Sequence, residues 1–133
     1  MTVTTRLVAA TGVYAAVQLV HGLVPADTEA ESYVGLVAGL VQLVATLAAL
    51  YGLRVGAAWA ERLAGAVGVL GAVGITAYHL TPVTSPATNP YVGEGVGAAA
   101  WLSVLAVVAG GLWTAAEAWR GRSVTASAPG PTG

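Results

Sequence analysis

The chain has 133 residues, of which 56% are hydrophobic and only 8% are charged. Soluble domains carry about one-quarter charged residues. A soluble domain this poor in charge would have too little polar surface to face water, so the composition predicts an integral membrane protein. The absence of cysteine excludes disulfides, thiolate nucleophiles and cysteine metal sites. The net charge of −1 offers no basic surface, and we expect no nucleic-acid partner.

Four segments are long and apolar enough to be transmembrane helices. A helix needs roughly 20 apolar residues to cross the hydrocarbon layer, where every backbone group must be hydrogen-bonded within the segment. The four segments are residues 5–24, 34–53, 57–80 and 95–119. We therefore predict an all-α fold, an antiparallel bundle of four transmembrane helices that forms one domain over residues 1–119. Residues 120–133 are too poor in apolar side chains to fold and are predicted to be a disordered cytoplasmic tail.

The arginines indicate how the bundle is oriented in the plasma membrane. All of them fall on one side of the predicted topology: Arg6, Arg54, Arg62, Arg120 and Arg122. The connections on the opposite side carry acidic residues: Asp27, Glu29, Glu31 and Glu94. Positive charge marks the cytoplasmic side, so both termini are expected in the cytoplasm, with the lipid bilayer as the main partner of the chain.

A secretory signal is the alternative interpretation of the first span. Arg6, the apolar run after it and the sequence Val24-Pro25-Ala26 fit a signal cleaved after Ala26. The apolar run is longer than a typical signal core, which favours a span.

Identical residues that recur 58 positions apart suggest that the chain consists of two similar halves. The sequence Y-V-G-x-x-x-G begins at Tyr33 and again at Tyr91, and the same offset relates His21 to His79. Duplicated helical hairpins would have the same orientation in the membrane, related by an axis along its normal. The C-terminal ends of the first and third spans would then bring both histidines to similar depth in the outer leaflet.

Small and polar residues predict how the spans pack. Small residues let helix backbones approach closely in lipid, and the third span carries a stripe of them: Gly65, Gly68, Gly71 and Gly74. This stripe is expected to be a contact face, either within the bundle or between protomers of a homo-oligomer or a larger complex. Gln42 is expected to make a hydrogen bond between spans. The deep aromatic residues Tyr14, Trp101 and Trp113 are expected between helices. Glu117 and Arg120 are three residues apart, which favours a local ion pair.

The candidate site consists of His21 and His79, the only histidines of the chain. Gln18 and Thr76 each lie three residues before one of them, on the same helix face, where they could support the imidazole. Imidazoles from facing helices can hold a haem b iron or a transition-metal ion. His21, His79 and Glu94 would make a metal site of two histidines and a carboxylate, with Asp27 as another carboxylate. A quinone site and a proton relay are further alternatives. The structural interpretation is that both histidines bond to water or backbone at the membrane interface.

Function stays open between three classes at this stage. The first is a structural or accessory membrane protein, and the second is an outer-leaflet cofactor-binding protein that uses His21 and His79. The third is a small transporter or channel formed by an oligomer, with Gln18, Gln42 and Thr46 lining a polar path. The sequence has no phosphate-binding loop, nucleophile elbow or zinc-protease motif, so it is not expected to be a soluble-type enzyme. Asn89, ahead of Pro90, is expected to be the N-cap of the fourth span.

Overall fold

The computed structural model describes residues 2–24, 33–83, 85, 88–92 and 95–126. Four α-helices account for most of them: α1 (Val3–Leu23), α2 (Tyr33–Arg54), α3 (Ala60–Leu80) and α4 (Ala98–Ala126). Of these, α2, α3 and α4 are long and apolar enough to cross a membrane. The all-helical prediction is confirmed. The helix α1 is not among these three, and it carries the polar residues Arg6, Gln18 and His21.

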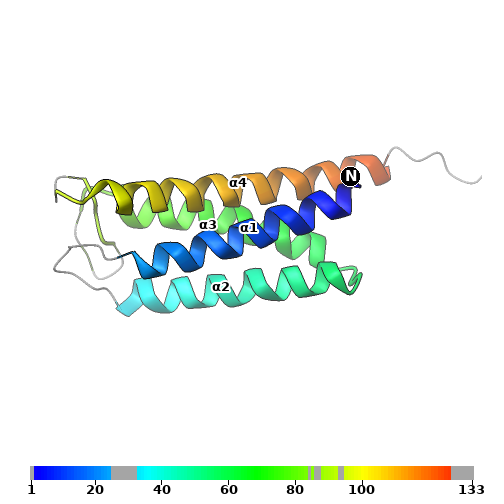
Figure 1. The fold of residues 1–133 in the computed structure, drawn as a ribbon, viewed down its shortest axis with the longest axis horizontal. Helices are drawn as coiled ribbons and strands as arrows, with labels where there is room; N and C mark the ends of the chain where they lie inside the picture. The colour runs from blue at the N-terminus through cyan, green and yellow to red at the C-terminus, as the bar shows by residue number, and fades with distance from the viewer. Residues whose placement is uncertain (1, 25–32, 84, 86–87, 93–94, 127–133) are drawn as a thin grey trace, which may run out of the picture.

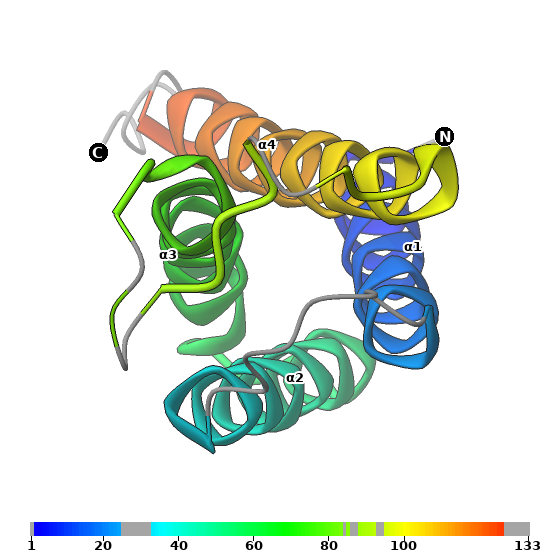
Figure 2. The same cartoon turned by 90° about the vertical axis from the view of Figure 1, so that its left-hand side faces the viewer.

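The helices lie side by side and form a ring (Figures 1 and 2). In this ring α1 and α3 each pack against both α2 and α4, so α1 and α3 are diagonal to each other. The turn at residues 55–59, between α2 and α3, lies at one end, which we call the turn end (Figure 1). The C-terminal ends of α1 and α3 lie at the other end, which we call the histidine end.

The helix bounds agree with the expected spans except around α4. This helix begins at Ala98, after Gly95, whose φ of +66° is a conformation that favours glycine. Asn89 is therefore not its N-cap, and that prediction was wrong. At the other end α4 continues through Arg120 to Ala126, into the segment expected to be a disordered tail. Residues 127–133 lie outside the described part of the chain.

Tyr14 occupies the centre of the bundle and is fully buried. Glycines on two other helices make room for it. A Cβ at Gly71 would collide with its hydroxyl, and Cβ atoms at Gly110 and Gly111 would approach its ring to 3.2 and 3.3 Å. The Tyr14 hydroxyl donates to the carbonyl oxygen of Val67 at 3.4 Å. The expectation that Tyr14 packs between helices is confirmed, whereas Trp113 is 41% exposed and does not follow it.

Two side-chain hydrogen bonds join α1 to α2. Gln42 Nε2 donates to the Tyr14 hydroxyl at 3.2 Å, and Gln18 Nε2 donates to Thr46 Oγ1 at 3.0 Å. Gln42 also donates to the carbonyl oxygen of Val67 on α3, at 2.6 Å. The expected interhelical bond of Gln42 is therefore confirmed. These amides would be costly in an apolar interior without partners.

Glycines also set the spacing of α3 and α4. A Cβ at Gly68 would lie 2.5 Å from the carbonyl oxygen of Gly111, and one at Gly65 would lie 3.2 Å from the Ala118 Cβ. Gly74, by contrast, faces open space. The predicted contact face of the third span is thus confirmed within the bundle for Gly65, Gly68 and Gly71. Near the turn end, Arg120 pairs with the buried carboxylate of Glu117, as expected.

The predicted internal repeat is not reflected in the structure at its most distinctive motif. Tyr33 begins α2 and is 78% exposed, whereas Tyr91 precedes α4 by several residues and is 4% exposed. His21 and His79 do lie at similar places, in the last turns of α1 and α3, and the duplication stays a prediction.

Gly68→Ala is expected to destabilise the protein by about 1–3 kcal/mol, because the new methyl group meets backbone atoms of α4 that can move only if the helices separate. Thermal unfolding in mild detergent measures this. Gly74→Ala is the matched control, in the same helix but with nothing near its Cβ, and should unfold at or above the temperature of the parent protein. Equal stability of the two variants would contradict the close approach of α3 and α4.

Candidate functional site

His21 and His79 meet at the histidine end of the bundle. Their ring centroids are 5.3 Å apart, and the rings are nearly perpendicular, at 85°. His21 is two residues from the end of α1, and His79 is one residue from the end of α3. Because α1 and α3 are diagonal in the ring of helices (Figure 2), the contact between the two imidazoles spans the ring at its histidine end. His79 is 3% exposed, and His21 is half-buried.

The His79 ring is fixed by the segment that follows α3. Its Nδ1 lies 2.9 Å from the backbone oxygen of Asn89. Two backbone bonds tie the same segment to the end of α3: Asn89 N donates to the Tyr78 carbonyl at 2.9 Å, and Tyr91 N donates to the His79 carbonyl at 2.8 Å. His79 thus holds residues 89–91 over the end of the bundle.

The His21 ring is fixed by α4. Its Nδ1 lies 2.9 Å from Ser103 Oγ, and the Ser103 hydroxyl donates to the Ala100 carbonyl at 2.7 Å. Ser103 is itself buried. The two histidines are therefore oriented by two different elements, α4 and the segment after α3.

Aromatic side chains surround His79. The Tyr91 ring centroid lies 3.9 Å from that of His79, and Tyr78 approaches from another side at 4.8 Å. Trp101 packs edge-on against Tyr91 at 5.6 Å. Burial and the neighbouring Tyr78 raise the pKa of Tyr91, so its phenol stays neutral. The position of Tyr78 in turn requires a glycine at position 35 of α2, because a Cβ on Gly35 would collide with the Tyr78 hydroxyl.

The residues expected to support the histidines make other hydrogen bonds. Gln18 bonds to Thr46 across the α1–α2 contact, and Thr76 donates to the Ala72 carbonyl of its own helix at 2.7 Å. Glu94 and Asp27, the expected carboxylate ligands, lie outside the described residues. Within the described part of the chain no group of three histidine, cysteine, aspartate or glutamate side chains is positioned to hold a metal ion.

Ser103, Asn89 and Tyr91 are the contacts that sequence reasoning did not assign to the site. Ser103 is 82 residues from His21, and Asn89 is 10 residues from His79, across the connection after α3. In the sequence Ser103 is distinguished only as a polar residue within an apolar span. No spacing rule connects it to α1, because the contact depends on how two helices pack.

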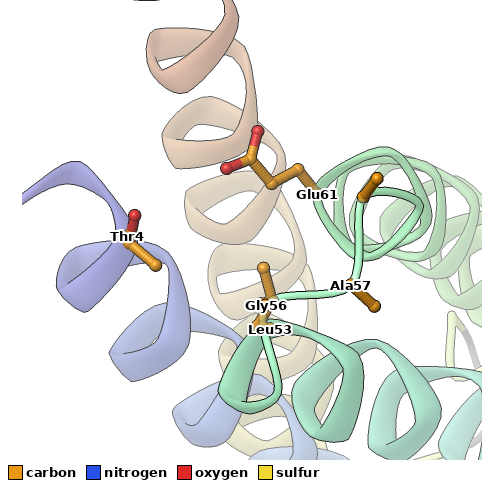
Figure 3. Close-up of a pocket in the computed structure, with 6 residues that line it drawn as sticks. Thr4, Leu53, Gly56, Ala57 and Glu61 are labelled. Carbon is orange, nitrogen blue, oxygen red and sulfur yellow. The ribbon is translucent and has the colours of Figure 1, made fainter.

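A cavity of about 310 Å³ lies at the opposite, turn end (Figure 3). In Figure 3 Glu61 extends from the start of α3 toward the side where Thr4 lies on α1. The remaining lining is backbone and small apolar side chains of the α2–α3 turn and its approach: Leu53, Gly56, Ala57 and Ala58. One carboxylate among such neighbours does not make a set of acid, base and nucleophile.

Comparisons with protein-family models, with curated proteins and with solved structures find no match to this chain. The geometry of the histidine pair is therefore the main indication of function.

His79→Phe is expected to loosen the segment at residues 88–91, because a ring of similar size cannot donate to the buried Asn89 carbonyl. Amide hydrogen exchange at Asn89 and Tyr91 should accelerate on the order of tenfold, as expected when a hydrogen bond worth about 1–2 kcal/mol is lost. His21→Phe is the control, since its hydrogen bond runs to α4 and should leave both amides protected. Unchanged exchange in His79→Phe would show that the segment is held by other contacts.

Proposed function

We propose that the chain is a plasma-membrane protein whose four helices all cross the bilayer as an antiparallel bundle, with both termini cytoplasmic. The character of α1 supports a fourth span. Its polar residues Thr11, Tyr14 and Gln18 make hydrogen bonds, of which those of Tyr14 and Gln18 run to neighbouring helices. The side chains on its outer face are apolar and exposed, as a lipid-facing surface requires: Val13, Leu19, Val20 and Leu23.

The arginines support the orientation. The N-terminus of α1 and the end of α4 lie near the turn end, so every arginine of the chain is carried by a helix terminus at that end (Figure 1). By the positive-inside rule the turn end is cytoplasmic, and the histidine pair belongs to the outer side. Lipid then covers the exposed apolar face of α2, which includes Leu36, Leu40, Val41 and Val44.

Single cysteines test this topology, because the chain has no native cysteine. In intact cells a membrane-impermeant maleimide should label Val83→Cys and should leave Ala58→Cys and Thr2→Cys unlabelled until the cells are opened. These three positions are exposed in the protein. Labelling of Thr2→Cys in intact cells would mean that α1 does not cross. Loss of residue 2 from the mature protein would identify the first segment as a cleaved signal.

We propose further that the histidine pair is a ligand-binding site and that the protein acts through the ligand it holds there. One observation carries this proposal: the only two histidines of the chain converge to 5.3 Å from opposite corners of the bundle. Ionisable residues within spans are costly and are retained mainly where they serve function. Phenylalanine or leucine would fill the same space without that cost.

A structural role is the second candidate, and the bond of His79 to Asn89 favours it. In that role the histidines hold the segment at residues 88–91 and α4 in place, and the protein acts as an accessory bundle within a larger complex or homo-oligomer. The channel hypothesis receives less support. Gln18 of α1 donates to Thr46 of α2, and Gln42 of α2 donates to Tyr14 of α1 and to the Val67 carbonyl of α3. Such bonds between helices are typical of packing contacts.

Ligand content distinguishes the two candidates. The full chain, purified in mild detergent without a histidine tag, should contain a stoichiometric metal ion, haem or quinone, measured by elemental analysis, absorption spectroscopy and mass spectrometry of extracts. His21→Ala and His79→Ala should both lose it, whereas Thr76→Ala, one turn from His79 and bonded within its own helix, should retain it. If the parent protein carries no ligand, and takes up no metal ion, haem or quinone when these are supplied, the structural role is the remaining candidate.

A further inference from the structure

We infer that the histidine pair binds a divalent transition-metal ion from the late first row, through the Nε2 atoms of His21 and His79. This inference rests on the proposed ligand site and names its ligand class. It follows from which ring nitrogens carry protons, from the separation of the rings and from the charge of the site.

The proton of His79 is located by its partner. A backbone carbonyl oxygen only accepts hydrogen bonds, so the Nδ1 of His79 that lies against Asn89 O must be the protonated nitrogen. In the neutral ring the Nε2 atom then carries a lone pair. A histidine that donates Nδ1–H to a backbone carbonyl is the usual arrangement of a metal ligand, because this bond fixes the tautomer and the direction of the ring.

The position of the proton on His21 follows from the hydrogen bonds of Ser103. The Ser103 hydroxyl has one hydrogen, and it is directed to the Ala100 carbonyl at 2.7 Å. Ser103 Oγ therefore accepts from His21, and Nδ1 of His21 is the protonated nitrogen. Both rings of the pair thus present Nε2 as an electron-pair donor, although their partners come from unrelated parts of the chain.

The ring separation fits one metal ion and does not fit a haem. With metal–nitrogen distances of roughly 2.0–2.1 Å, two imidazoles on a tetrahedral ion have centroids roughly 5 Å apart. The observed separation is 5.3 Å. Axial ligands of a haem instead stand on opposite faces of the macrocycle. Ring centroids 5.3 Å apart leave no room for a haem between them, and α1 and α3 would have to separate to admit one.

The charge of the site selects the kind of metal ion. Two neutral imidazoles suit zinc, copper and nickel, whereas magnesium and calcium require oxygen ligands. Beyond these two imidazoles, the described residues add no further ligand group, so water or an exogenous ligand completes the coordination. The ion enters past the half-buried His21 because His79 is covered. Affinity should follow the general order for such ions, with Cu²⁺ above Ni²⁺ and Zn²⁺.

Cu²⁺ titrated into the untagged full chain in mild detergent tests the inference. Electron paramagnetic resonance should show one copper per chain with two imidazole nitrogens, and Zn²⁺ should compete for the site only in large excess. His21→Ala and His79→Ala should each abolish this signal. Copper binding that persists unchanged in the double variant would overturn the assignment to these rings.

Ser103→Ala provides a second test that does not alter a ligand. Removing the acceptor of His21 Nδ1–H should weaken Cu²⁺ binding 10- to 100-fold while the thermal unfolding curve stays cooperative. Thr76→Ala is the matched control and should bind like the parent. Equal affinity of the two variants would overturn the role of Ser103 as a positioning residue.

The two proposals can fail separately. A haem or quinone bound at the histidine pair, with no Cu²⁺ or Zn²⁺ taken up, would overturn the metal inference and leave the ligand site standing. Protein that binds neither an organic cofactor nor a metal ion would overturn both.

Discussion

The position of Tyr14 is the constraint on which the rest of the bundle depends. This one side chain contacts all four helices: it is carried by α1, accepts from Gln42 of α2, donates to Val67 of α3 and lies against Gly110 and Gly111 of α4. A phenol so deep in an apolar bundle needs both a donor and an acceptor, and two helices supply them. The room for its ring exists only because the facing positions lack a Cβ. Glycine in the helix interior is unfavourable by itself, and here it is offset by the packing of the largest buried side chain.

The meeting of the two histidines follows from this packing. His21 lies seven residues after Tyr14, which is two helical turns, so both side chains project from the same face of α1. Once Tyr14 is directed at the bundle axis, Gln18 and His21 are directed inward as well. On α3 the close contact of Gly68 with α4 sets the height and direction of that helix, and the segment after it covers His79. The diagonal contact at the histidine end is thus determined by packing near the middle of the bundle.

Much of this architecture could be predicted from the sequence, because it depends on local properties. The apolar runs predicted four helices, and the glycines of the third span predicted a contact face. Gln42 in mid-span was expected to make a hydrogen bond to another helix. The partners themselves could not be predicted. Gln18 lies on the same face of α1 as His21 and was expected to support the imidazole, yet its side chain donates to Thr46 on α2. Asn89 precedes a proline, which suggested a cap for α4, but its backbone pairs with the end of α3. These outcomes depend on contacts across the fold, which spacing along the chain does not encode.

The structural and metal-binding interpretations of the histidines differ in what they require of Nε2. Holding α4 and residues 88–91 uses only Nδ1, and an asparagine or a serine could supply such a donor. A structural role therefore gives no reason for two imidazoles in ring contact, each with its second nitrogen an acceptor. The two Nε2 lone pairs are then left to bind water, a proton or a cation. A shared proton would use one lone pair on each ring but would leave a charged imidazole in an apolar bundle. A metal ion satisfies both nitrogens at once and brings water as further ligands, so it accounts for more of the observed arrangement than either alternative.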